Sequence, residues 1–213
     1  MPTSISEEHG LAYMSDADLV VYSVGISTAG AAEIKMAKSN AKRKIIATTL
    51  DEEGLNETKN FIANQNLQDR IICKIEDVSK KLPYDDEYFD YIYARLVLHY
   101  LSKQQLSSAL AELHRVLKTE GKLFVVVRSI ECPDYKIRIK YDEKTGFSYS
   151  ASPNTGILRK RYFHSTESIC EALARANFSI VDTSSYSEQL YSGYGRKVLS
   201  KNIDHLIEVK AKK

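Results

Sequence analysis

Residues 82–127 read LPYDDEYFDYIYARLVLHYLSKQQLSSALAELHRVLKTEGKLFVVV. Phe89 to Ala94 is apolar enough to predict a buried strand, and Lys122 to Val127 predicts a second one. Between them, residues 102–117 predict an amphipathic helix. Its core stripe consists of leucines at helical spacing: Leu106, Leu110, Leu113 and Leu117. A strand, a helix, a turn at Gly121 and another strand are typical of a right-handed crossover in a parallel sheet.

The same alternation continues on both sides of this stretch. Apolar runs at residues 19–24, 45–49 and 70–75 predict three further strands of a parallel sheet. Helical spacing over residues 29–41 predicts a helix after the first of them, and Asp51 is placed to cap a helix that runs to about Asn64. After a helix that ends near Ala176, the runs at 178–181 and 205–209 predict two final strands. No helix separates these two, so they are expected to pair as antiparallel neighbours.

Composition mainly excludes some classes of partner and site and does not identify the function. The chain has 213 residues and a net charge of +2, which suits one domain and argues against nucleic acid as a partner. Two short basic clusters, at residues 42–44 and 158–161, are more typical of a solvated surface. No apolar run is long enough to span a membrane. The three cysteines are far apart and predict free thiols in a cytoplasmic protein, with no disulfide framework and no metal site.

Residues 82–127 resemble the second half of a class I S-adenosylmethionine-dependent methyltransferase domain. In that family a Leu-Pro-aromatic-acidic loop precedes a Phe-Asp strand, and a helix ending in Arg-Val-Leu-Lys leads to the next strand. The matching segments are Leu82-Pro83-Tyr84-Asp85, Phe89-Asp90 and Arg115-Val116-Leu117-Lys118. The resemblance covers residues 18–128 well and 160–212 more loosely.

The resemblance implies an α/β fold over residues 1–213. We expect a Rossmann-like sheet of seven mostly parallel strands, an antiparallel last strand and helices on both faces. It also implies S-adenosyl-L-methionine as the cofactor and methyl transfer as the activity. Ligands of such sheets bind beyond the carboxyl ends of the strands, so the loops there are expected to hold the site.

The first of these loops, residues 23–30, departs from the family pattern. The family has a Gly-x-Gly-x-Gly turn with an acidic residue two positions before its first glycine. This chain keeps Gly25 and Ile26, but it has Ser27 and Ala29 at the later glycine positions and Ser23 at the acidic position. Small side chains still permit close approach of the backbone to the methionine half of the cofactor. The missing carboxylate is the more serious departure.

Three further loops complete the expected cofactor site. Thr49, followed by Leu50, stands where the family has a carboxylate that binds the ribose hydroxyls, and a neutral partner weakens that contact. Asp77, followed by Val78, fits the position that receives the adenine amino group; a surface turn is the alternative. The strand end at Ala94 and Arg95 is expected to contact the cofactor as well.

The acceptor site is less defined. His99 is a candidate catalytic base, but a lone histidine in an apolar stretch can equally be a packed structural residue. Residues 1–17 are expected to form a short lid through Tyr13 and Met14. The polar, Tyr-rich insertion at 131–163 and the segment 186–196, which includes Tyr194, are expected to supply the substrate wall. These tyrosines fit an interface or loop packing equally well.

Two functional hypotheses follow. The first is a methyltransferase that acts on a small-molecule acceptor. The second is a non-catalytic protein of the same fold that serves as a binding or scaffold subunit, because Ser23, Ser27 and Thr49 all weaken the cofactor pattern. The sequence leaves a homo-oligomer open and does not identify the methyl acceptor.

Overall fold

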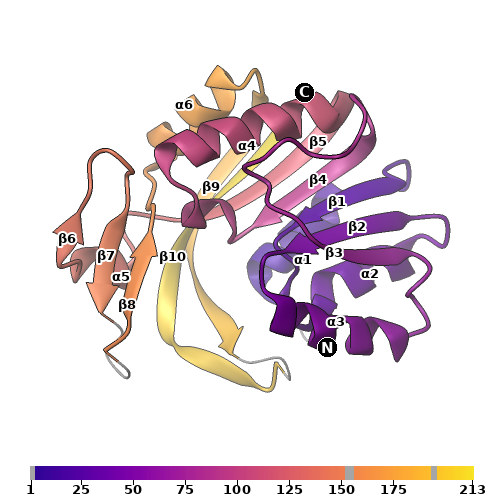
Figure 1. Ribbon diagram of the computed structural model, residues 1–213, viewed down its shortest axis with the longest axis horizontal. Helices are drawn as coiled ribbons and strands as arrows, with labels where there is room; N and C mark the ends of the chain where they lie inside the picture. Colours follow the sequence, from indigo (N-terminus) through magenta and orange to yellow (C-terminus); the bar gives the residue numbers. More distant parts are fainter. Residues whose placement is uncertain (1–2, 152–155, 193–195) are drawn as a thin grey trace.

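The computed structural model describes residues 3–151, 156–192 and 196–213. Its main sheet has seven strands in the order β3-β2-β1-β4-β5-β10-β9 (Figure 1). The strands of this sheet are β1 (Val20–Val24), β2 (Lys44–Thr49), β3 (Ile71–Ile75), β4 (Phe89–Arg95), β5 (Leu117–Arg128), β9 (Ser179–Ser192) and β10 (Val198–Lys212).

The first five strands are parallel and the last pair is antiparallel, as predicted. β1 lies between β2 and β4, and Val21 is in register with both Ile45 and Tyr91. β10 runs antiparallel to β5 on one side and to β9 on the other. The expected seven-stranded, mostly parallel sheet is therefore confirmed, with β10 as its single reversed strand.

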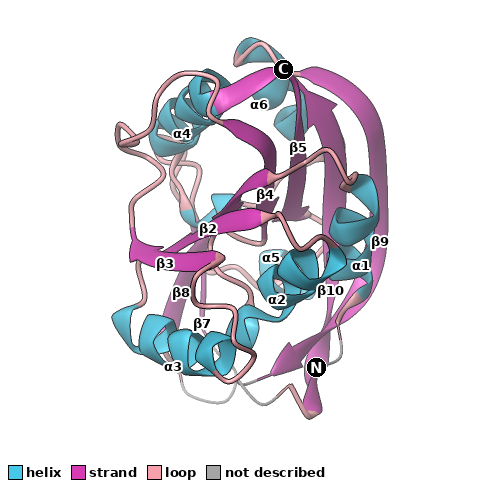
Figure 2. Ribbon diagram, turned by 90° about the vertical axis from the view of Figure 1, so that its right-hand side faces the viewer, coloured by secondary structure: helices cyan, strands magenta, loops and turns pink. Residues whose placement is uncertain are grey.

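Helices cover both faces of the sheet (Figure 2). One face packs against α4 (Lys103–Val116) and α6 (Thr166–Arg175), mainly through the leucine stripe of α4. The other face packs against α1 (Ile5–Tyr13), α2 (Ala31–Ser39) and α3 (Glu52–Ala63). The helix starts follow local sequence, because Ser102 and Asp51 each accept a backbone N–H with the side chain and so cap α4 and α3.

The N-terminal segment is a helix packed on the sheet, not the lid expected of Tyr13 and Met14. The hydroxyl of Tyr13 donates to the carbonyl of Ala211 at 3.2 Å, and its ring meets Tyr91 edge-on. Both contacts lie on the sheet face, and Met14 packs against the same apolar cluster. Tyr13 and Met14 pack there because their apolar side chains bury more surface against the strands than over an open site.

The closing strands are longer than predicted. β9 and β10 form a hairpin that extends well beyond the edge of the main sheet (Figure 1). β5 is also longer: it begins at Leu117, and the turn expected at Gly121 is instead a register shift in its pairing with β4. The alternating polar residues of the hairpin concealed its length, because strand periodicity fades where both faces are exposed.

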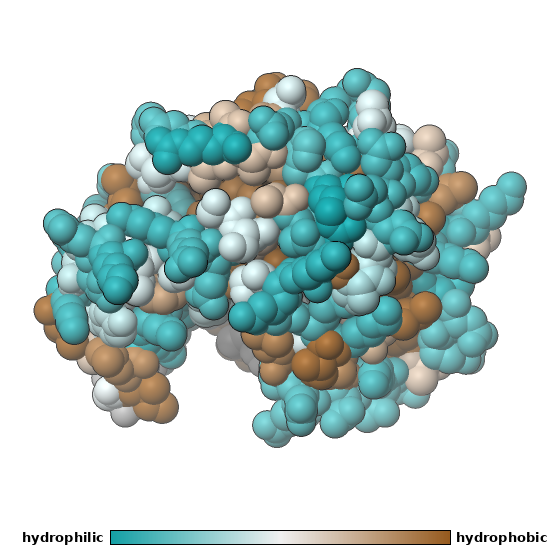
Figure 3. All heavy atoms as spheres, turned by 45° about the horizontal axis from the view of Figure 1, so that its top comes forward, coloured by the Kyte–Doolittle hydropathy of each residue, from teal (hydrophilic) through white to brown (hydrophobic). Residues whose placement is uncertain are grey.

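The Tyr-rich insertion forms a second, small sheet. After α5 (Pro133–Lys136) come β6 (Lys140–Tyr141), β7 (Ser148–Ala151) and β8 (Leu158–Arg161), paired antiparallel in that order. Gly146, at φ +79°, lies in the turn between β6 and β7. The surface is hollowed between the lobe that carries this sheet and the main body (Figure 3).

Two sequence features concern the surface. In the described part of the chain, no helix has the length and apolar character needed to cross a membrane. The basic cluster at 42–44 is not a continuous charged patch, because Arg43 is buried and donates to the backbone carbonyls of Ser15, Asp18 and Met36.

Candidate active site

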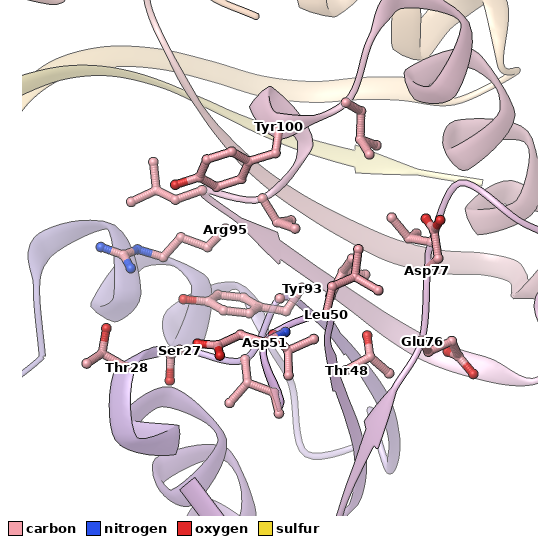
Figure 4. Close-up of a pocket in the computed structure, with 18 of the residues that line it drawn as sticks. Ser27, Thr28, Thr48, Leu50, Asp51, Glu76, Asp77, Tyr93, Arg95 and Tyr100 are labelled. Carbon is pink, nitrogen blue, oxygen red and sulfur yellow. The ribbon is translucent and has the colours of Figure 1, made fainter. Parts of the chain in front are cut away.

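A pocket of about 610 Å³ opens at the carboxyl ends of the parallel strands. The ends of β1, β2, β3 and β4 supply most of its wall, and the segment from Tyr100 to Gln105 and the β9–β10 hairpin complete it (Figure 4). This is the crevice where open α/β sheets bind ligands.

Most of the predicted cofactor residues line this pocket. They are Gly25, Ile26, Ser27, Thr49, Leu50, Asp77, Val78 and Arg95. Ser23 and Ala94 do not line it, because both are completely buried within their strands. The reason is the alternation of side chains along a strand, which turns the residue before each strand end into the core.

The first loop is built for close approach. Gly25 has φ +74°, and a Cβ there would lie 2.8 Å from the Cβ of Val97, so only glycine fits. Ile26 then donates its N–H to the carbonyl of Thr48 at 2.9 Å, which fastens the loop to the neighbouring strand. Ala29 and Gly30 also have positive φ in the short turn η1 (Thr28–Gly30). The tight turn is thus kept although Ser27 and Ala29 replace both later glycines, and Ala29 adopts the left-handed backbone that glycine favours.

Glu33, on α2, is a site residue that the sequence analysis missed. Its carboxylate is fully buried beneath the first loop and accepts from the hydroxyl of Ser23 at 2.6 Å. It also accepts from the N–H of Ser27 at 3.1 Å and from the Ser27 hydroxyl. Ser23 and Ser27, which depart from the family pattern, therefore both donate hydrogen bonds to a carboxylate at the base of the loop.

The second loop carries two polar groups at the pocket edge. The hydroxyl of Thr49 accepts from the N–H of Asp51 at 3.1 Å. Asp51 accepts from the N–H of Gly54 at 3.1 Å and so caps α3, as predicted. Asp51 also lines the pocket, which gives this side of the site a carboxylate that Thr49 does not provide.

The third loop carries two carboxylates with different surroundings. Asp77 is half-buried, and one of its oxygens accepts from the N–H and hydroxyl of Ser79 at 2.9 and 2.7 Å. Glu76 instead accepts from the hydroxyls of Tyr22 and Tyr84 at 2.5 and 3.0 Å. Burial and this carboxylate raise the pKa of both phenols, so both remain hydrogen-bond donors. Glu76 is committed to the protein, whereas Asp77 is the carboxylate available to a ligand.

Tyr93 brings an unsatisfied hydroxyl to the opposite side of the pocket. Its ring stacks on Phe124 and is 1% exposed, and Gly10 makes room for it, since a Cβ there would approach the ring to 2.5 Å. Its hydroxyl has no hydrogen-bond partner among the described residues. In Figure 4 this hydroxyl lies on the same side as Thr28 and Arg95, away from Asp77. Because a buried hydroxyl without a partner is costly, this corner suits a polar ligand group.

The hairpin closes this corner through charges. The guanidinium of Arg196 pairs with Glu7 of α1 and donates to the carbonyl of Thr28 at 3.4 Å. Arg95 lies 3.5 Å from Glu7 and donates to the hydroxyl of Ser6 at 2.6 Å. Burial alone would raise the pKa of Glu7, but the two guanidinium groups outweigh it and hold that pKa below its usual value.

His99 lies behind the pocket, and the catalytic role predicted for it has no contact to support it. It is buried, does not line the pocket, and has neither ring nitrogen hydrogen-bonded in the described structure. Its ring lies 4.4 Å from that of Tyr100, which does line the pocket. Burial lowers the pKa of His99 well below its usual value, and Arg128, Arg161 and His164 lower it further.

The two segments expected to form the substrate wall differ. Leu190, Tyr191 and Arg196 of the hairpin line the pocket, as predicted for 186–196. No described residue of 131–163 does so; Arg161 of β8 comes near the site, with its guanidinium 5.8 Å from the Tyr100 ring centre. Tyr194 lies outside the described residues.

Comparison with known proteins agrees with this geometry. Residues 23–125 match a family model described as a methyltransferase domain. No curated protein sequence matches the chain.

Solved structures share the fold across nearly the whole chain. An S-adenosylmethionine-dependent methyltransferase from Methanosarcina mazei has 18% identity and a TM-score of 0.73, over 95% of each chain. A 1,6-didemethyltoxoflavin N1-methyltransferase from Burkholderia thailandensis, solved with S-adenosylhomocysteine, has 17% identity and a TM-score of 0.66, over 98% of this chain and 78% of that one. The [4+2]-cyclase SpnF has 18% identity and a TM-score of 0.67, over 97% and 79%. Residues 23–125 thus match a methyltransferase domain, and the strand order and the solved structures show that the chain has the fold of class I S-adenosylmethionine-dependent methyltransferases.

Proposed function

We propose that this protein transfers a methyl group from S-adenosyl-L-methionine to a small-molecule acceptor. The observation that carries the proposal is the pocket itself. It is open, it lies at the carboxyl ends of the strands, and it is lined by the loops that the family uses for its cofactor. Side chains of the protein do not fill it, as they would in a collapsed and purely structural descendant of the fold.

The residues present fit the cofactor. The Gly25 turn allows close backbone approach, and the unpaired hydroxyl of Tyr93 can bind a polar group of the methionine half. Thr49 and Asp51 are placed for the ribose, and Asp77 and Val78 for the adenine. The bound cofactor would supply an electrophilic sulfonium methyl group, which an acceptor lone pair takes as the thioether leaves.

The protein's part in the reaction is mainly positioning. Gly25, Asp77 and Tyr93 would fix the orientation of the cofactor, and such alignment can account for much of a displacement rate. The acceptor would enter over a mostly apolar part of the wall that consists of Leu96, Val97, Tyr100, Leu101, Gln105, Leu190 and Tyr191. A cavity of about 610 Å³ is of the size that holds small molecules.

Two further points support a small acceptor in the cytoplasm. The toxoflavin methyltransferase of the same fold was solved with a small heterocycle bound. The three cysteines of this chain are free thiols, which agrees with a reducing compartment.

Calorimetric titration with S-adenosylmethionine and S-adenosylhomocysteine tests the cofactor part of the proposal. We expect both to bind with micromolar dissociation constants. Formation of S-adenosylhomocysteine with a panel of small apolar nucleophiles then tests the transfer. Absence of binding would reject the proposal. Binding without turnover on any acceptor would instead favour the non-catalytic alternative.

A further inference from the structure

Glu33 is a buried charge whose partners are all neutral. The side chain is completely buried, and no Lys or Arg lies within ion-pair distance of it among the described residues. Among the described residues, its two carboxylate oxygens accept only from Ser23 and Ser27. A buried charge without an opposite charge is costly, so its retention at this position needs an explanation.

Helix capping explains part of the arrangement. Ser27 accepts from the N–H of Ala32 at 3.0 Å and donates to Glu33, which resembles a capping box stretched by the intervening turn. The macrodipole of α2 also favours a carboxylate in its first turn. Capping does not explain Ser23, which belongs to β1 and is completely buried, and which still directs its hydroxyl at the same carboxylate.

We propose that Glu33 is the positioning residue of the cofactor loop and provides its negative charge from α2, in place of the carboxylate absent at position 23. Ser23 connects the two positions, because its hydroxyl near the end of β1 donates a hydrogen bond to the Glu33 carboxylate. Ser27 lies between Glu33 and the pocket, so its N–H and hydroxyl orient the loop that lines the pocket.

The proposal rests on the proposed function, since the ligand that would balance this charge is the cofactor. S-adenosylmethionine carries two positive groups, an ammonium and a sulfonium, whereas S-adenosylhomocysteine carries only the ammonium. A negative charge beneath the loop therefore favours the sulfonium form over the thioether form. Helix capping alone would not distinguish them.

The test moves the carboxylate from position 33 to position 23. Glu33→Gln keeps the shape and removes the charge, and we expect the dissociation constant for S-adenosylmethionine to rise about tenfold and that for S-adenosylhomocysteine about threefold. Ser23→Asp restores the family residue, yet it places two buried carboxylates together and should also weaken binding about tenfold. The double variant has one carboxylate again and should return to within about threefold of the wild type.

Calorimetry well below each melting temperature separates these effects from unfolding. Glu112→Gln is the matched control: it removes a carboxylate that accepts from the N–H of Leu82 at 2.9 Å, away from the pocket, and should leave both dissociation constants unchanged. A wild-type protein that binds neither ligand would overturn the proposed function. The role of Glu33 alone would be overturned if the wild type binds and Glu33→Gln leaves both dissociation constants unchanged. It would also be overturned if Glu33→Gln raises both dissociation constants by the same factor. A double variant no better than Ser23→Asp would do the same.

Discussion

The loop wall and the hairpin wall of the pocket each contain one completely buried glutamate, and the two are held in opposite ways. In the loop wall, residues 23–33, Glu33 is bound by serines that lie six and ten positions away in the sequence. Beside the hairpin wall, which is formed by Arg95 and the β9–β10 hairpin, Glu7 of α1 faces two arginines, and Arg196 lies 189 positions away. One glutamate has neutral local partners, and the other has charged distant ones.

This difference indicates that the charge in the loop wall serves ligand binding, whereas the charges in the hairpin wall hold the fold together. In the hairpin wall, Glu7 and Glu188 balance Arg95 and Arg196, so the charges cancel within the protein. This cluster joins α1 to the β9–β10 hairpin. In the loop wall the charge of Glu33 is left for a ligand to balance. Variants in the two walls should therefore affect different measurements.

The largest effect is expected when the hairpin wall loses its carboxylate. Glu7→Gln removes the buried carboxylate that Arg95 and Arg196 share and should lower the free energy of unfolding by about 3–5 kcal/mol. The control is Glu8→Gln, whose exposed pair with Lys35 should contribute less than about 1 kcal/mol. Urea unfolding of both variants measures this. Equal losses would show that the Glu7 cluster is no more than a surface contact.

The loop wall should be most sensitive at Gly25. Gly25→Ala combines a left-handed backbone with a Cβ 2.8 Å from that of Val97, so we expect a loss of about 2–4 kcal/mol and at least tenfold weaker cofactor binding. Gly156→Ala is the matched control, because Gly156 has φ +66° with open space around it. It should cost about 1 kcal/mol and leave binding intact. Normal cofactor affinity in Gly25→Ala would remove the loop from the binding site.

Acid should destabilise the protein, because the buried side chain of His164 then becomes protonated. Burial lowers the pKa of His164 from 6.5 to about 4. The unfolded chain binds this proton more readily, so the contribution to stability is complete above about pH 6.5 and is lost as the pH falls towards 4, by at most about 3 kcal/mol. Unfolding free energies measured across this window should fall less steeply for His164→Gln than for the wild type. Equal slopes would contradict the role of His164.

Asp77 tests the adenine end of the loop wall. Asp77→Ala should weaken cofactor binding by about 1–3 kcal/mol, because it removes a charge-assisted hydrogen bond. Asp77→Asn keeps an acceptor for the N–H of Ser79 and separates this effect from the local turn. Unchanged affinity in both variants would place the adenine elsewhere.

The smallest expected effect is a gain. Thr49→Asp adds a carboxylate at the pocket edge and should tighten cofactor binding about tenfold, or about 1.4 kcal/mol, through charge-assisted bonds to the ribose. Calorimetric titration combined with a thermal melt measures both affinity and stability. A lower melting temperature with no gain in affinity would show that the new carboxylate is buried without a partner.

The sheet could be predicted because its signals are local. Apolar runs, the leucine stripe of α4 and the Asp51 cap each act within a few residues. The family resemblance, and not local periodicity, led us to expect Gly25 and Asp77 in the cofactor loops, and both line the pocket. Tyr93 could not be, because an aromatic residue in an apolar strand predicts only a core position. Its unpaired hydroxyl depends on what the neighbouring elements leave open.

The sequence by itself determined the α/β class, the strand boundaries near the pocket and the loops that line it. Periodicity and capping, which determine these features, are properties of short segments. Only the tertiary structure decided that α1 packs on the sheet, that the small sheet stays off the pocket and that Arg196 meets Glu7. It also decided that Ser23 meets Glu33. Charge pairing and burial are properties of positions in space, and segments far apart in a sequence acquire neighbouring positions only when the chain has folded.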